Sequence, residues 1–183
     1  CTFSRLSELN KMKEPKFVFA HILSPHPPYV FGANGEPTPK AIYQMDRNVW
    51  ELKEDYLNQL SFINKKVQTL IDTILLRSEV PPIIVLQADH GSASTWWNTG
   101  SSGWDEHPTE LMLRERMGIF NAYYLPPGGN SLIFDSITPV NTFRLIFNIY
   151  FNMQFTLLSD KNYFSIYSNP YEFVDVTYIF NND

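Results

Sequence analysis

The sequence has 183 residues, an apolar share of 44% and a formal net charge of −5, with no long run of one sign. This length and composition suit one sizeable folded domain. The acidic balance argues against a nucleic-acid-binding surface, which normally carries clustered basic residues. The negative net charge does not exclude small anionic substrates, because one bound metal ion can make the local electrostatic potential positive inside an acidic protein.

Cys1 is the one cysteine, which excludes an intramolecular disulfide bond. No apolar run approaches the roughly 20 residues that span a bilayer. The start of the chain has neither a signal-peptide pattern nor a methionine. We therefore expect a piece of a longer protein, in which residues 1–15 are a short polar helix, an arm or a cut end and residues 16–183 belong to one domain.

The first apolar run is Lys16 to Leu23 (KFVFAHIL), whose residue types predict a buried strand. The chain then enters Ser24-Pro25-His26-Pro27-Pro28-Tyr29, where three prolines exclude regular structure and hold the backbone extended. Residues 32–40 are predicted to form a loop.

From about Val49 to Arg77 the apolar residues recur at spacings of three and four, which predicts a helix with one apolar stripe. The stripe consists of Tyr56, Leu60, Ile63, Val67, Leu70, Ile71, Ile74 and Leu75. Pro81 and Pro82 end this element. Residues 83–88 (IIVLQA) are short, β-branched and nearly all apolar, as expected of a strand covered on both faces.

Residues 91–113 lack periodicity and predict a long loop, which in a domain of this size is functional or disordered. Residues 118–125 (GIFNAYYL) predict another strand. Thr138-Pro139 is a favourable helix start, and the apolar pattern carries this helix to about Asn152. Residues 173–180 are a candidate edge strand. The order strand, helix, strand, strand, helix implies an α/β sandwich.

Asp89 and His90 directly follow the strand at 83–88, and Gly91 follows them. A carboxylate and a neutral imidazole both bind zinc, and the carboxylate also suits magnesium, manganese or calcium. Because an unpaired charge is costly to bury, an aspartate at the end of a buried strand suggests a cation. The alternative is an aspartate that caps a turn beside a histidine that packs or hydrogen-bonds.

Neighbouring residues on a strand point to opposite faces, so Asp89 and His90 can share one metal only where the strand breaks into a loop. Gly91 suits that break, because glycine adopts backbone angles closed to other residues. The ends of such strands are also where α/β sheets place their ligand crevices.

The stretch Pro82 to Gly91 (PIIVLQADHG) resembles the strand and "DHG" signature of sulfatases, lipoteichoic-acid synthases, phosphoethanolamine transferases and related members of the alkaline phosphatase superfamily. Residues 20–29 (AHILSPHPPY) look like a second signature of these enzymes, a strand leading to a histidine and then Pro-Tyr. The helix at 56–75 and the strand at 116–126 resemble their counterparts in the same order. The resemblance covers about residues 16–165.

The resemblance implies the C-terminal part of a sulfatase-like catalytic domain, with an α/β fold of three layers around a central, mostly parallel sheet. It implies a divalent metal ion (Zn, Mn, Mg or Ca) held by Asp89 and His90. It implies that His26 lies near the phosphate or sulfate of the substrate. His107 is the candidate for a further histidine that transferases of the family carry in the loop after the metal strand.

The family also needs an acidic metal ligand and a nucleophile in a motif far upstream, and residues 1–15 do not resemble that motif. Cys1 is followed by Thr-Phe-Ser-Arg, which lacks the sulfatase pattern, so Cys1 is not assigned as the nucleophile. We expect the upstream half of the same protein to complete the active site, and the isolated fragment to be inactive.

Other polar and aromatic residues have competing interpretations. His21 lies in an apolar run and is more typical of a core histidine. Trp96, Trp97 and Trp104 could line a substrate pocket or anchor the loop to the core. Arg114 and Arg116 could meet an anionic substrate, although the neighbouring glutamates favour a solvated or paired face. The aromatic stripe at 143–151 is interpreted as core.

The leading hypothesis is therefore a metal-dependent hydrolase or transferase acting on small sulfate or phosphate esters, with lipid- or glycan-linked substrates possible and no nucleic-acid partner. One alternative is an inactive binding or structural module that retains the fold. Another is an unrelated α/β domain in which Asp89-His90 is a coincidence. The compact Pro-His-Pro-Pro-Tyr motif looks like that of proteins tethered by a membrane segment, here outside this chain, with the catalytic domain at the cell surface.

Overall fold

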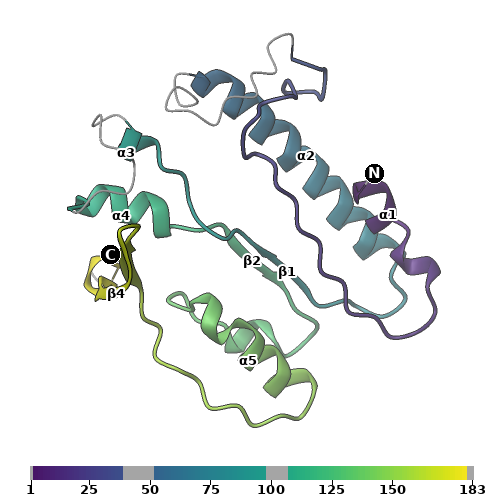
Figure 1. Ribbon diagram of the computed structural model, residues 1–183. Coiled ribbons are helices and arrows are strands. Elements are labelled where there is room, and N and C mark those ends of the chain that lie inside the picture. Colours follow the sequence, from purple (N-terminus) through teal and green to yellow (C-terminus); the bar gives the residue numbers. More distant parts are fainter. Residues whose placement is uncertain (1, 39–51, 98–106, 181–183) are drawn as a thin grey trace. The chain divides into compact units, whose positions relative to one another are not determined.

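The protein is described by a computed structural model covering residues 2–38, 52–97 and 107–180 (Figure 1). The chain divides into two compact units, Cys1–Pro81 and Pro82–Asp183. Each unit has its own elements and its own packing, so the two are treated one after the other.

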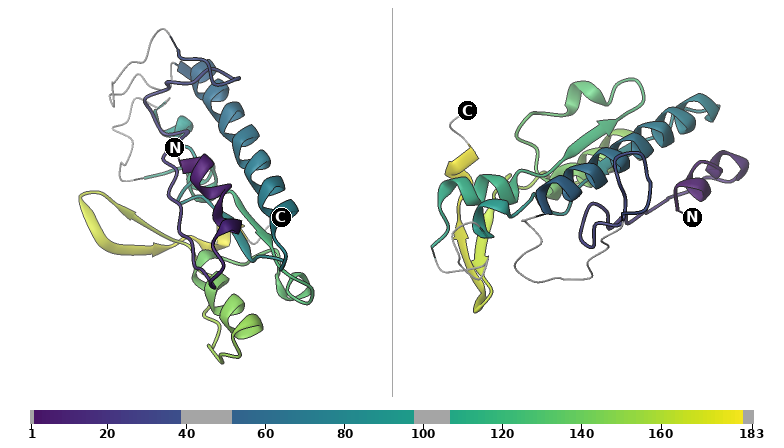
Figure 2. Two further views of the ribbon diagram at one scale, coloured as in Figure 1. Left: turned by 90° about the vertical axis from the view of Figure 1, so that its right-hand side faces the viewer. Right: turned by 90° about the horizontal axis from the view of Figure 1, so that it is seen from above.

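The first unit is built on one long helix, α2 (Lys53–Arg77). The predicted apolar stripe of this helix is confirmed, since all eight of its residues are buried or half-buried. A short helix, α1 (Thr2–Leu6), and a 3-10 turn, η1 (Leu9–Lys11), precede it. Helix α1 lies beside α2 (Figure 2), and Arg77 at the end of α2 donates a hydrogen bond to the carbonyl oxygen of Ser7 at 3.4 Å.

The predicted strand at residues 16–23 is wrong. This segment forms neither strand nor helix, and most of its apolar side chains are exposed, with Phe17 at 80%, Phe19 at 81% and Leu23 at 72%. An apolar, β-forming run becomes a strand only when a neighbouring strand accepts its backbone hydrogen bonds. None of the described residues pairs with it in that way.

In the second unit, β1 (Ile84–Gln87) and β2 (Asn121–Tyr124) confirm two of the predicted strands. They pair antiparallel, with Ile84 opposite Tyr124 and Gln87 opposite Asn121. Strand β1 is half-buried rather than covered on both faces. The hydrogen bond from Ala88 N to Phe120 O at 2.8 Å continues the pairing up to Asp89.

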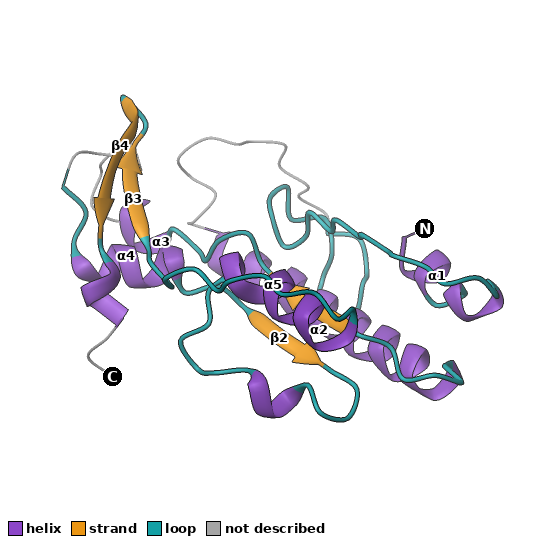
Figure 3. Ribbon diagram, turned by 90° about the horizontal axis from the view of Figure 1, so that it is seen from below, coloured by secondary structure: helices purple, strands orange, loops and turns teal. Residues whose placement is uncertain are grey.

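A hairpin of β3 (Tyr163–Ile166) and β4 (Asn169–Asp175) forms a second antiparallel pair (Figure 3). The predicted edge strand at 173–180 is therefore displaced, because the strand ends at Asp175 and residues 177–180 form a 3-10 turn, η4 (Thr177–Phe180). Every residue of β4 is exposed.

The predicted α/β sandwich with a central, mostly parallel sheet is wrong for the described residues. They hold two separate two-stranded antiparallel sheets. A parallel sheet needs adjacent strands joined by crossover connections, whereas residues 16–23 pair with nothing described and β1 pairs only with an antiparallel neighbour. The order of elements suggested a sandwich, but strand order along the chain does not determine which strands pair.

The long loop predicted at 91–113 contains helical structure. A short helix, α3 (Ser94–Trp97), follows Gly91, and α4 (Glu110–Met117) begins inside the predicted loop. Thr109 caps α4 by accepting a hydrogen bond from Met112 N at 3.3 Å, and Arg114 and Arg116 lie in its last turn, where cations are favourable. Residues 98–106 lie outside the described residues.

The last long helix, α5 (Pro139–Tyr150), confirms the predicted start at Thr138-Pro139. The Thr138 side chain does not cap the helix; its hydroxyl and its backbone N–H both donate to Asp160, at 2.7 and 2.6 Å. A 3-10 turn, η3 (Asn130–Leu132), precedes α5. The predicted aromatic core at 143–151 is wrong, because Phe143, Phe147 and Phe151 are exposed.

Among the helices that the structure describes, none combines the length and apolar character needed to cross a membrane.

Candidate functional site

The Asp89 and His90 side chains meet where β1 ends. Oδ2 of Asp89 lies 3.4 Å from Nε2 of His90, and the side chains are 80% and 43% exposed, respectively. The other oxygen, Oδ1, accepts a hydrogen bond from His90 N at 3.0 Å. This bond is the turn-capping contact expected if the motif were only structural, and it leaves Oδ2 facing the imidazole. Because Asp89 is exposed, its charge is solvated, and burial supplies no argument for a cation.

The separation of Oδ2 and Nε2 fits a shared metal ion. Two ligand atoms bonded at about 2.0–2.2 Å to a tetrahedral ion lie about 3.3–3.6 Å apart. The observed 3.4 Å falls inside that interval. No group of three or more histidine, cysteine, aspartate or glutamate side chains suited to a metal occurs among the described residues. The described part of the chain thus offers a pair of ligands rather than a complete coordination shell.

Gly91 is needed for a close backbone approach rather than for unusual backbone angles. Its N–H donates to the carbonyl oxygen of Arg116 at 2.7 Å. A Cβ atom at this position would overlap the carbonyl oxygen of Glu115 and lie 3.0 Å from that of Gly118. Gly91 is not among the described glycines with positive φ, so the predicted reason for this glycine is wrong. Its small size lets the Asp89-His90 turn lie directly against the end of α4.

Arg116 is the cation nearest to the pair in the contacts of the described residues. Its Nη1 lies 2.6 Å from Nδ1 of His90 and donates to the carbonyl oxygen of Gly91 at 2.9 Å. Burial lowers the pKa of Arg116, while the carboxylates of Asp89 and Glu115 oppose that shift. A guanidinium remains charged in proteins, so Arg116 places a positive charge at the base of the turn.

Two tautomers of His90 compete in this arrangement. Nδ1 lies 2.9 Å from the carbonyl oxygen of Gly91, to which a protonated Nδ1 can donate. That tautomer leaves Nε2 with a lone pair beside Asp89, as metal-binding histidines require. In the other tautomer Nδ1 accepts a hydrogen bond from Arg116, and the proton on Nε2 faces Asp89.

Glu115 is a residue that the sequence did not single out. Its carboxylate accepts hydrogen bonds from the hydroxyl groups of Ser92, Ser94 and Thr95 and from the backbone N–H groups of Ser94 and Thr95, both at 2.8 Å. Partial burial would raise the pKa of Glu115, but these hydrogen bonds outweigh it and lower the pKa to about 2. The carboxylate fixes the segment after Gly91 to α4. The cluster of small hydroxyl residues at 92–95 was the available signal.

His26 belongs to the first unit, where its imidazole is exposed and Nδ1 donates to Pro27 O at 2.7 Å. The loop around it is held by Gln59 of α2, which is 1% exposed. The Gln59 amide donates to the carbonyl oxygens of Pro25, His26 and Pro28 and accepts from the N–H groups of Val30 and Phe31. The signal available for this residue was a polar side chain between two positions of the apolar stripe.

The remaining candidate residues are dispersed. His107 and His21 are exposed. Trp96 is 2% exposed, donates from Nε1 to Met112 O at 3.2 Å and packs against Phe164, so it anchors the loop to the core. Arg114 pairs with Glu110 at 3.1 Å. Trp104 and the side chain of Trp97 lie outside the described residues.

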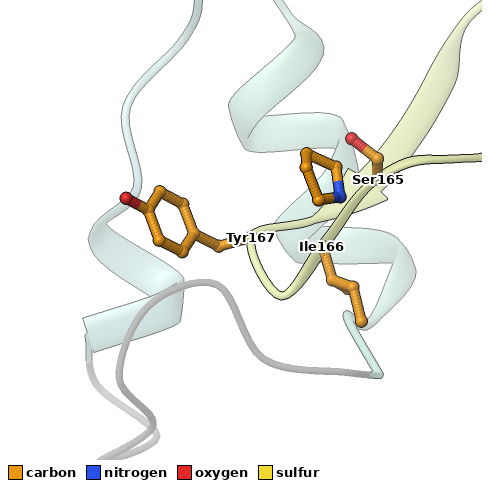
Figure 4. Close-up of a pocket in the computed structure, with 4 residues that line it drawn as sticks. Ser165, Ile166 and Tyr167 are labelled. Carbon is orange, nitrogen blue, oxygen red and sulfur yellow. The ribbon is translucent and has the colours of Figure 1, made fainter.

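A surface pocket of about 340 Å³ lies at the turn between β3 and β4 (Figure 4). It is lined by Ser165, Ile166, Tyr167 and Pro170. These residues include no carboxylate, imidazole or cationic side chain, so this pocket has no groups for metal binding.

Comparison with known proteins finds no match to the chain, whether among family models, curated proteins or solved structures.

Proposed function

We propose that this chain supplies a divalent-metal site for hydrolysis or transfer of sulfate or phosphate esters, with Asp89 and His90 as metal ligands. The observation that carries the proposal is the 3.4 Å separation of Asp89 Oδ2 and His90 Nε2 at the end of β1. The contact between His90 Nδ1 and Gly91 O supports it, because a proton on Nδ1 that Gly91 O accepts leaves the lone pair of Nε2 for a metal.

Zinc is the ion that this pair favours, because imidazole and carboxylate suit it and the separation fits tetrahedral geometry. When bound, such an ion neutralises charge on the non-bridging oxygens of an ester and lowers the pKa of a nucleophile. The proposal assigns the nucleophile to no residue of this chain.

Chain residues near the pair favour an anionic ligand. Arg116 carries a positive charge next to His90, and both Asp89 and His90 are open to solvent. Separately from these contacts, His26 of the first unit and His107 of the second remain proposed as groups that donate hydrogen bonds to ester oxygens, since each imidazole is exposed. Nδ1 of His26 is held by Pro27 O, which leaves Nε2 for a ligand. The setting proposed for this chemistry is the cell surface.

A second candidate is a metal-binding or structural module without turnover. The observation in its favour is that the described residues group only two ligands at the site. Two ligands hold a metal weakly, and ester chemistry needs further groups. Metal binding is common to both candidates, and turnover of an ester separates them.

Calorimetric titration with Zn²⁺, Mn²⁺, Mg²⁺ and Ca²⁺ tests metal binding. The expected result is one Zn²⁺ site, weakened at least tenfold by Asp89→Asn or by His90→Gln. The matched controls are Asp135→Asn and His21→Gln, which change exposed residues of the same types and should leave the affinity unchanged. Equal Zn²⁺ binding by all five proteins would overturn the proposal.

Release of nitrophenol from p-nitrophenyl phosphate and p-nitrophenyl sulfate then separates the two candidates. Because we propose that an upstream half of the protein completes the site, the assay uses a polypeptide that joins such a half to this chain. Metal-dependent release by this polypeptide, lost in Asp89→Asn, supports the enzyme. Metal binding without release of either product by that polypeptide supports the module.

A further inference from the structure

Helix α5 has apolar residues on two faces. Leu145 and Ile146 are buried at 8% and 4% exposure, whereas Phe143, Phe147 and Phe151 are 45%, 39% and 59% exposed. A helix that packs one face against its own unit normally carries polar residues on the other. The outer face of α5 is instead aromatic, and this calls for an apolar environment.

The exposed rings form one continuous surface with Phe155. The ring centroids of Phe143 and Phe147 are 6.2 Å apart, those of Phe147 and Phe151 are 5.6 Å apart, and those of Phe147 and Phe155 are 6.1 Å apart. We call these four residues the phenylalanine cluster. Further large apolar side chains exposed in the same stretch are Val140, Met153, Leu157 and Leu158.

The segment after α5 runs back along the helix (Figure 1), bound to it by asparagine side chains. Asn148 donates to Phe155 O at 2.8 Å and accepts from Phe155 N at 2.7 Å. Asn141 makes the same two bonds to Leu158, at 2.8 and 3.0 Å. Both backbone polar groups of Phe155 and of Leu158 are therefore satisfied within the unit.

Arg144 completes this row on α5, between Asn141 and Asn148. It donates to the carbonyl oxygen of Thr156 at 3.0 Å, and its guanidinium lies 6.0 Å from the centre of the Phe155 ring. Residues 136–159 contain no acidic residue, and Arg144 is their one charge. Asp135 and Asp160 bound the stretch at its two ends.

From this arrangement we propose that α5 and residues 151–158 dock on the surface of a lipid bilayer, with the phenylalanine cluster entering the boundary between headgroups and acyl chains. Amphipathic helices of this kind place aromatic residues in that boundary and keep cations near the headgroups. The inference is independent of the metal site.

The hydrogen bonds favour a bilayer over a partner strand. A strand from another protein would bind through free backbone N–H and C=O groups, but those of Phe155 and Leu158 are already bonded to Asn148 and Asn141. An acyl environment imposes the opposite requirement, because backbone polar groups that enter it must be satisfied internally. Charged side chains are also unfavourable in an acyl environment, and residues 136–159 contain no acidic residue.

Flotation of the full chain with phosphatidylcholine vesicles tests the proposal. The expected result is that the chain floats with the vesicles. Phe147→Ser/Phe151→Ser should weaken the partition about 30-fold, since two half-exposed rings are removed. Phe151 lies just after the end of α5, so Phe151→Ser alone leaves the helix sequence unchanged. This single variant should weaken the partition about fivefold, and it preserves the test if the double variant misfolds. Circular dichroism checks the helix content of each variant.

The matched control is Phe17→Ser/Phe19→Ser, which removes two rings that are even more exposed, at 80% and 81%, from the first unit. This variant should float as the unaltered chain does. The proposal is overturned if the unaltered chain stays in the unbound fraction, or if the control variant loses flotation and the α5 variants keep it. It is also overturned if sedimentation shows a dimer that Phe151→Ser dissociates, because a second copy would then cover the cluster.

Discussion

Nη1 of Arg116 lies 2.6 Å from Nδ1 of His90, so a guanidinium contacts the imidazole that we propose as a metal ligand. Both groups also reach the carbonyl oxygen of Gly91, at 2.9 Å each. Arg116 therefore stabilises the tautomer of His90 that carries its proton on Nε2. A metal ion at Nε2 requires the other tautomer, with the proton on Nδ1. The arginine and the ion therefore favour opposite tautomers of the His90 ring.

Replacing Arg116 should tighten metal binding. In Arg116→Gln the amide can still donate to Gly91 O, but the positive charge and the hydrogen bond to His90 are lost. We expect Zn²⁺ affinity to rise about three- to tenfold, because a like charge near the ion is removed. Calorimetric titration measures the change, with Arg114→Gln as the control on the same helix. An unchanged or weaker affinity in Arg116→Gln would show that the arginine does not compete with the ion.

Gly91→Ala should destabilise the second unit by about 1–3 kcal/mol, because the added methyl group overlaps the backbone of α4. Urea unfolding measures this free energy. Gly128→Ala is the comparison, since a Cβ there meets nothing within 4 Å and the only cost arises from its φ of +100°. We expect Gly128→Ala to cost about 1 kcal/mol. A smaller loss for Gly91→Ala than for Gly128→Ala would contradict the close-approach account.

Glu115→Gln should destabilise the second unit in a pH-dependent way. The folded pKa of about 2 lies below the unfolded value of about 4.3. The carboxylate therefore contributes stability above pH 4.3, and this contribution is lost as the pH falls towards 2. The difference in unfolding free energy between Glu115→Gln and the unaltered chain should shrink across that interval, as followed by urea unfolding at several pH values.

Glu110→Gln is the control for this experiment, because its carboxylate makes one exposed ion pair with Arg114. We expect that variant to change the unfolding free energy by less than about 1 kcal/mol. The difference in unfolding free energy between Glu115→Gln and the unaltered chain could instead stay constant from pH 6 to pH 2. That result would argue against a hydrogen-bonded carboxylate with a low pKa.

Gln59→Leu should release the proline-rich loop that carries His26. The substitution leaves the backbone groups of Val30 and Phe31 without the partner that Gln59 provides, at a cost of about 2–4 kcal/mol for the buried polar groups. Hydrogen exchange of the Val30 and Phe31 amides should accelerate. Gln68→Leu, at an exposed position of the same helix, should leave that exchange unchanged. Equal protection in both variants would contradict the anchoring role of Gln59.

Helices α2 and α5 could be predicted because their signals are local. The stripe of α2 and the Thr138-Pro139 start of α5 depend on residues within a few turns of each other, and both elements formed close to the expected bounds. Strand β1 ended within one residue of the expected position, which placed Asp89 and His90 correctly at a strand end.

Pairing between distant segments could not be predicted in the same way. The run at 16–23 has the composition of a strand but lacks a described partner, and composition does not specify one. The apolar pattern of α5 predicts a core position for its aromatic rings, but periodicity identifies an apolar face without showing whether anything covers it, and these rings are exposed.

Side-chain contacts at the site depended on the same long-range information. Glu115 binds hydroxyl groups some 20 residues earlier in the chain, and Arg116 reaches His90 across 26 residues. Both contacts require α4, a helix that was hidden in a sequence resembling a loop. Only the Asp89-His90-Gly91 turn was visible from the sequence, since its residues are adjacent.

Nitrogen NMR of the His90 ring during a Zn²⁺ titration shows whether Nε2 binds the ion. We expect the Nε2 signal of His90 to shift on binding, while Nδ1 carries the proton that Gly91 O accepts, and we expect Asp89→Asn to weaken this shift. No change in the His90 signals at saturating Zn²⁺, or coordination through Nδ1, would contradict the proposed site.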